Sequence, residues 1–135
     1  MRILGIDPGD RRIGLSVSDE TGIIAQGLDT FDKRNGIDFL VYISDLTRTY
    51  DVSEIVIGDP VLLSGRRGES SDKAKALAGK LRRRFDIPVT LWDERLSSSE
   101  ARRVLRGSKS DKGTVDKLAA VIILQSYLDY RRNAE

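Results

Sequence analysis

The chain has 135 residues, of which 39% are hydrophobic and 33% charged, and its formal net charge is +2. Length and composition predict one soluble globular domain over residues 1–135. Cysteine and histidine are both absent, which excludes disulfides, thiolate zinc sites, cysteine nucleophiles and Ser-His-Asp catalysis. Acid–base or metal chemistry must then use Asp, Glu, Lys or Tyr, and oxygen ligands suit hard ions such as Mg²⁺. We find no signal peptide or membrane-length apolar run, and expect a cytoplasmic protein without a membrane partner.

The predicted elements alternate along the chain. Alternating apolar residues predict strands over 2–7, 13–18 and 23–31, which suit an antiparallel meander. A helical apolar stripe predicts a helix over 36–50, and a nearly all-apolar run predicts a buried strand over 54–58. The later segments predict a helix over 72–85 and then a strand over 89–92. A capping box predicts that the next helix runs from 97 to about 106, and Thr114 is predicted to cap a last helix over 114–132. This order predicts a mixed α/β sheet with helices packed on it.

Carboxylates follow each strand that would be parallel in such a sheet. Asp7 ends the first strand, Asp59 follows the strand 54–58, and Asp93 and Glu94 follow the strand 89–92. If these strands are parallel, their carboxyl ends meet at one edge of the sheet, where α/β proteins bind ligands. The pattern is consistent with a two-metal site.

Asp116 adds an acidic side chain from the last predicted helix. It shares a helical face with Ala120, Ile123 and Tyr127, so we expect it to face the sheet. A carboxylate in such a place needs a partner or a cation. Small residues on one face of the second strand, such as Gly14, leave room at the sheet.

A purely structural role also fits each acid taken alone. Asp7 and Asp59 both precede proline and could start turns. Asp116 could complement the dipole at the start of its helix. Glu100 is explained by the capping box that begins at Ser97, so it is not a catalytic candidate.

Four segments resemble, in order, the conserved blocks of one family. They are DPGDRRIGLSVSD, IVIGDPVLLSG, LWDERLSSSEA and KGTVDKLAAVIILQSYL. They are similar to the D-x-G-x-x-R-I-G, V-G-x-P-x-x-x-x-G, D-E-R-L-[ST]-[ST] and V-D-x-x-A-A blocks of the YqgF/RuvX family. Its members are described as Holliday-junction-resolvase-like nucleases and as processing the 5′ end of pre-16S rRNA. The resemblance implies an RNase H-like fold, with a five-stranded mixed sheet flanked by helices.

The resemblance also implies a site and an activity. The family's acidic positions fall on Asp7, Glu94 and Asp116, which would hold two Mg²⁺ or Mn²⁺ ions for the hydrolysis of phosphodiester bonds in structured nucleic acid, either pre-rRNA or branched DNA. Asp59 departs from the family pattern, because members usually carry an apolar residue there. It could add a fourth acid or only shape the turn. The protein would act as a monomer or a homodimer.

Basic residues cluster in the segments around these acids, and such clusters favour an anionic partner. The candidates for phosphate contacts are Arg11, Arg12, Arg66, Arg67, Lys109 and Lys112. Arg12 could instead pair within the fold.

Two other classes of function stay open at this level. The turn after Asp7 resembles the phosphate motif of sugar-kinase and actin-like ATPases, but the chain has Asp10, Arg11 and Arg12 where those proteins have small hydroxylated residues. The second alternative is a binding module: an RNase H-like scaffold that docks on ribosomal RNA or on a protein without cutting. Cleavage assays on the purified protein separate a nuclease from such a module.

Overall fold

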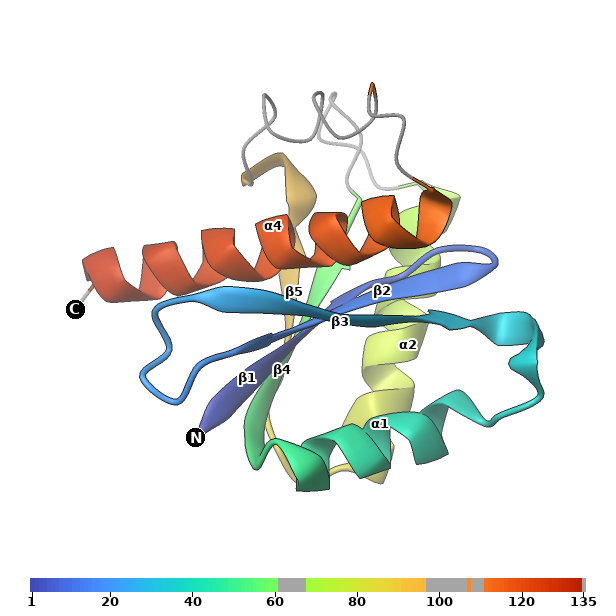
Figure 1. Cartoon of the computed structure of the whole chain (residues 1–135), viewed down its shortest axis with the longest axis horizontal. Coiled ribbons are helices and arrows are strands. Elements are labelled where there is room, and N and C mark those ends of the chain that lie inside the picture. Colours follow the sequence, from blue (N-terminus) through green and yellow to red (C-terminus); the bar gives the residue numbers. More distant parts are fainter. Residues whose placement is uncertain (61–67, 97–106, 108–110, 135) are drawn as a thin grey trace.

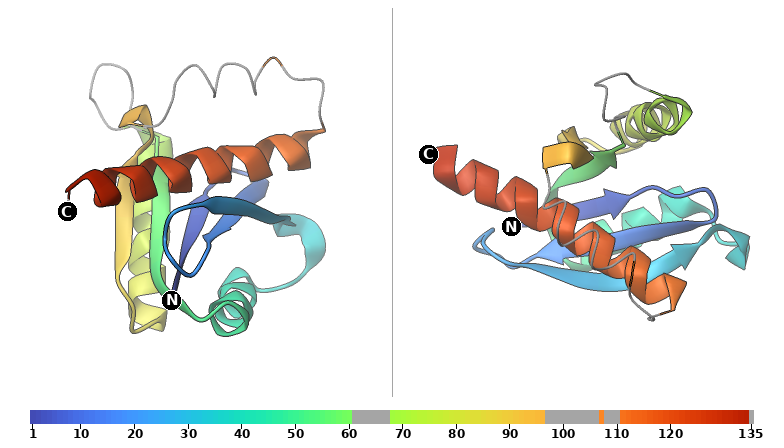
Figure 2. Two further views of the ribbon diagram at one scale, coloured as in Figure 1. Left: turned by 60° about the vertical axis from the view of Figure 1, so that its left-hand side comes forward. Right: turned by 90° about the horizontal axis from the view of Figure 1, so that it is seen from above.

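The computed structural model describes residues 1–60, 68–96, 107 and 111–134. Within them the strands form one five-stranded sheet in the order β3-β2-β1-β4-β5. Helix α4 lies across one face of the sheet, and α1 and α2 cover the other (Figures 1 and 2). The predicted mixed α/β sheet is therefore confirmed. None of the helices in these residues is long and apolar enough to cross a membrane.

The first three strands form the predicted antiparallel meander. They are β1 (Arg2–Asp7), β2 (Arg12–Ser18) and β3 (Ala25–Asp32). β3 begins two residues later than predicted, because the backbone N–H groups of Ile23 and Ile24 donate to the Asp19 carboxylate in the turn. The Thr21 hydroxyl and these two backbone N–H groups all donate to the carboxylate and lower the pKa of Asp19 to about 2.

The remaining strands are parallel to β1, as predicted. They are β4 (Val52–Asp59) and β5 (Val89–Asp93), and β5 leads into a short 3-10 helix, η2 (Glu94–Leu96). The register pairs Ile6 with Ile57 across β1 and β4. Asp59 is paired with Asp93 across β4 and β5. The carboxyl ends of β1, β4 and β5 therefore meet at one edge of the sheet.

Two helices cover the first face of the sheet. A 3-10 turn, η1 (Lys33–Asn35), leads to α1 (Phe39–Thr49), and α2 spans Glu69–Arg84. α1 starts later than predicted because Asp38 caps it, accepting the backbone N–H groups of Leu40 and Val41. The predicted helix over 97–106 lies outside the described residues.

The last helix, α4 (Lys112–Ala134), covers the second face. The prediction that Thr114 caps it is wrong. Asp111 accepts the backbone N–H of Thr114 at 2.9 Å and also its hydroxyl at 3.0 Å, so the helix begins two residues earlier. These bonds lower the pKa of Asp111, because they favour its charged form.

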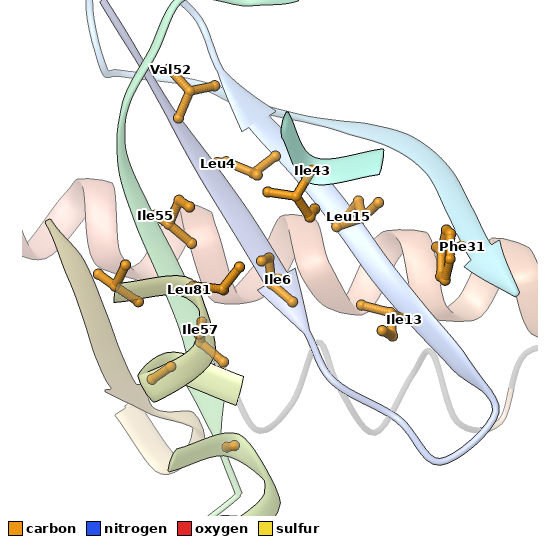
Figure 3. Packing of buried hydrophobic residues seen from close by; sticks show 13 residues of the cluster. Leu4, Ile6, Ile13, Leu15, Phe31, Ile43, Val52, Ile55, Ile57 and Leu81 are labelled. Atoms are coloured by element: carbon orange, nitrogen blue, oxygen red, sulfur yellow. The ribbon is translucent and has the colours of Figure 1, made fainter. Parts of the chain in front are cut away.

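The sheet separates two hydrophobic clusters. The larger cluster fills the space between the sheet and α1 and α2, with Ile6, Ile43, Ile57 and Leu81 fully buried (Figure 3). The smaller one lies under α4. Because successive strand residues point to opposite faces, β1, β3, β4 and β5 supply both clusters, whereas β2 supplies only the larger one.

α4 approaches β2 unusually closely at its first turns. A Cβ on Gly14 would lie 2.2 Å from the backbone oxygen of Asp116. Two residues along β2, the Ser16 hydroxyl donates to the backbone oxygen of Ala120 at 2.8 Å. The small residues predicted to leave room on this face of β2 therefore do so, and the helix occupies that room.

The Gly14 contact generates a stability prediction. Gly14→Ala should lower the free energy of unfolding by about 1–3 kcal/mol or more, because its neighbour is backbone and cannot rotate away. Gly79→Ala in α2 is the control, since the nearest atom is 3.3 Å away on the flexible Arg83 side chain. Alanine there should stabilise by about 0.5–1 kcal/mol, as expected within a helix. Urea unfolding of both variants measures the difference, and equal effects would contradict the close approach.

Candidate active site

Asp7 occupies the centre of the candidate site. It is the last residue of β1, half-buried, and on the face of the sheet that α4 covers. Its cross-strand partner on β2 is Gly14. On the other side, the β1–β4 register continued by one residue places Gly58 beside it. Asp7 therefore has a glycine on both sides, and neither covers its carboxylate.

Glu94 lies over Gly58. A Cβ on Gly58 would be 2.7 Å from Glu94 Oε1 and 3.3 Å from Glu94 Cγ. Any larger residue at position 58 would fill the space in which the Glu94 side chain lies. The sequence indicated Glu94 but not the role of Gly58, although a glycine within an apolar strand often marks a close approach.

Asp116 lies over Gly14. The Asp116 backbone packs on Gly14, and its side chain Oδ2 accepts the Arg12 Nε at 2.9 Å. The two side chains are 23% and 31% exposed, with Arg12 the more buried. The alternative in which Arg12 pairs within the fold is therefore confirmed, and its partner comes from α4.

Glu94 and the Asp116 backbone thus lie over the two strand positions that flank Asp7. Even so, within residues 1–60, 68–96, 107 and 111–134 no three acidic side chains are close enough to form a ready metal cluster. The donor set nevertheless fits Mg²⁺ or Mn²⁺, because it consists of carboxylate oxygens and Gly58 leaves the space that Glu94 uses. An ion bound by all three would either share the Asp116 carboxylate with Arg12 or displace Arg12 from it.

Asp59 faces away from these acids. It follows Gly58 on β4, so its side chain points to the α2 face, where it is 2% exposed. It accepts the Ser71 hydroxyl of α2 at 2.6 Å. Of the two roles left open for Asp59, the structure therefore supports a structural one. Asp93 shares this face through its register with Asp59 and bonds to Arg95.

The described residues include three of the six predicted phosphate contacts: Arg11, Arg12 and Lys112. Arg11 is exposed and lies 3.8 Å from the Asp32 carboxylate, whereas Lys112 is exposed at the start of α4, one helical turn before Asp116. Three of the candidates lie outside the described residues: Arg66, Arg67 and Lys109. Lys112 forms no ion pair with any residue that the structure describes.

The sheet order, with helices on both faces, is that of an RNase H-like fold. Among the solved structures that share this fold is Thermus thermophilus RuvC in complex with a Holliday junction substrate. Its TM-score is 0.60 at 16% identity, and the match covers 98% of this chain and 96% of RuvC. Another is the fowlpox virus Holliday junction resolvase, with a TM-score of 0.57 at 14% identity over 96% of this chain and 99% of the resolvase.

The sequence comparisons identify the family. The model of the family described as "RuvX: Holliday junction resolvase" matches residues 1–130. A Halothermothrix orenii protein named "Putative pre-16S rRNA nuclease" is 43% identical over 97% of this chain and 96% of its own length. A Koribacter versatilis protein of the same name is 46% identical over 96% of this chain and 88% of its own length. The chain belongs to the RuvX family.

The position of Asp59 generates the second prediction. Asp59→Leu should reduce the free energy of unfolding by about 1–3 kcal/mol, because it removes the buried hydrogen bond between Asp59 and the Ser71 hydroxyl. It should leave the affinity for Mg²⁺ unchanged, because the carboxylate points to the other face. Urea unfolding and Mg²⁺ titration calorimetry measure the two effects. A large loss of Mg²⁺ affinity in a folded Asp59→Leu protein would place Asp59 in the site after all.

Proposed function

We propose that this RuvX-family chain is a metal-dependent endonuclease that hydrolyses phosphodiester bonds in structured nucleic acid. The observation that supports it best is the arrangement around Asp7, where the Glu94 side chain and the Asp116 turn lie over two flanking glycines. The names of relatives and neighbours point to two substrates, pre-16S rRNA and Holliday junctions.

Asp7, Glu94 and Asp116 would hold Mg²⁺ or Mn²⁺, with two ions as the expected number. When bound, the ions supply a hydroxide-like nucleophile and stabilise the leaving 3′ oxygen. The protein has no histidine to act as a base, so its own contribution is to position carboxylates and cations. Arg11 and Lys112 are exposed at the same end of the molecule and would bind the phosphates on either side of the cut, together with Arg66, Arg67 and Lys109.

Arg12 has a separate role in this proposal. In the structure it neutralises Asp116, which otherwise would add its charge to Asp7 and Glu94. A substrate phosphate competes for the guanidinium with the same bidentate chemistry as a carboxylate. Nucleic acid that draws Arg12 away therefore releases Asp116 for metal binding, so metal and substrate should each increase the affinity for the other.

Cleavage assays test the proposed activity. Three variants, Asp7→Asn, Glu94→Gln and Asp116→Asn, should each lose metal-dependent cleavage. Each loss should exceed the roughly 10–100-fold that follows substitution of residues which only hydrogen-bond to metal ligands. The substrates are a four-way DNA junction and a pre-rRNA 5′ leader, assayed side by side with Mg²⁺ and with Mn²⁺. The matched control is Asp59→Asn, which makes the same change at the same sheet edge on the other face.

Circular dichroism shows whether each variant is folded. Near-wild-type rates in two of the three variants would contradict the site. A wild-type protein that binds both substrates and cuts neither would support the binding module instead.

The Arg12–Asp116 pair generates a prediction about metal affinity. Arg12→Gln should lower the Kd for Mg²⁺ by about two- to fivefold. In the variant the metal ion no longer competes with the Arg12–Asp116 ion pair, and pairs of this exposure contribute up to about 1 kcal/mol. Titration calorimetry without nucleic acid measures it. Arg11→Gln is the control, since it removes an equal charge that is 3.8 Å from Asp32 instead. Equal changes in the two variants would indicate a general charge effect and contradict the pairing argument.

A further inference from the structure

The face opposite the candidate site holds a second feature, which we call the α1–α2 pocket. It is a cavity of about 670 Å³ between α1, α2 and the turn that joins β1 to β2. Its volume lies within the range of roughly 300–1,000 Å³ that is usual for ligand sites. None of the three candidate metal ligands lines it.

The interior of the pocket is largely apolar and aromatic. Phe31 and Phe39 line it with their rings edge to face, 5.0 Å apart, and Leu77 of α2 forms the opposite wall. At the mouth, Ile37 is 51% exposed. A flat, weakly polar group fits such walls better than water does.

Cations surround the mouth of the pocket. Lys33, Lys73 and Lys80 all line it and all are exposed. Its two carboxylates already have partners: Asp10 accepts Lys73 at 3.0 Å, and Asp38 caps α1. Lys33 and Lys80 form no ion pair within the part of the chain that the structure describes. The pocket therefore combines an apolar interior with a basic mouth, where three lysines face two aspartates.

The pocket also adjoins the candidate active site through the chain itself. Pro8, Gly9 and Asp10 line it, and they follow Asp7 directly. One side of this short turn carries the proposed metal ligand, and the other forms the pocket wall. A nucleic-acid strand held at Asp7 needs only to cross this turn to reach the pocket.

We propose that the α1–α2 pocket binds an unpaired nucleotide of the substrate, with the base between the aromatic and aliphatic walls and its phosphates at Lys33 and Lys80. The inference rests on the proposed nuclease function and specifies its substrate. A base inside a duplex must leave its stack to enter a pocket, which is least costly where it is already unpaired. The pocket therefore selects nucleic acids with a single-stranded nucleotide next to the scissile phosphate.

The test compares two labelled strands of equal charge. One is a single-stranded oligodeoxythymidine 12-mer, and the other is an abasic strand of the same length. Binding is followed by fluorescence anisotropy in EDTA, where metal-dependent cleavage does not occur. The wild-type protein should bind the base-bearing strand at least about fivefold more tightly, as expected for one base that stacks on aromatic side chains.

Two pairs of variants locate the preference. Ile37→Ser should reduce the ratio of the two affinities by about three- to fivefold, because it removes apolar surface at the mouth. Ile24→Ser should not change the ratio, since Ile24 is also an exposed isoleucine but lies outside the pocket. The double variant Lys33→Ala, Lys80→Ala should weaken both strands alike and lower the salt dependence, whereas Lys75→Ala, elsewhere on α2, should do neither.

The outcomes separate the pocket from the nuclease activity. If the wild-type protein binds and cuts but does not prefer the base-bearing strand, or if Ile37→Ser leaves the preference intact in a protein with an unchanged melting temperature, the pocket proposal is wrong and the nuclease stands. A pocket that binds a protein segment would give this same result. If neither strand binds and neither the junction nor the leader is cut, both proposals fail.

Discussion

α4 can lie against the sheet beside Asp7 only because the two neighbouring strand positions carry no side chain. Gly14 accommodates the backbone of Asp116, and Gly58 accommodates the side chain of Glu94. This steric constraint places acidic residues from β1, η2 and α4 around one point. The rest of the site depends on it, because a larger residue at either glycine would move the helix or the glutamate away from Asp7.

Charge balance is the second constraint, and the fold meets it differently on its two faces. On the α4 face, Arg12 neutralises Asp116 by a contact that is direct but partly exposed to solvent. On the α2 face, Asp59 is buried and held by Ser71. The exposed pair suits a site that must rearrange to work, while the buried bond suits a fixed position within the core.

The turn that follows Asp7 connects these two faces. Its residues end the strand that carries the central carboxylate, and they also form a wall of the α1–α2 pocket. In an RuvX-family nuclease with this arrangement, cutting and recognition of the neighbouring nucleotide would use opposite sides of three residues. A substrate with an unpaired nucleotide beside the scissile bond would occupy both sides at once.

The sequence by itself determined the strands, the mixed sheet and the acids at its edge, because apolar periodicity and strand ends are local properties of the chain. Helix starts were less certain, since Asp111 and Thr114 are both good caps and only the folded backbone shows which one acts. The pairing of Arg12 with Asp116 joins residues 104 positions apart, and the α1–α2 pocket joins segments from Pro8 to Lys80. Only the tertiary structure decided these, because they depend on how strands align and how closely helices approach the sheet.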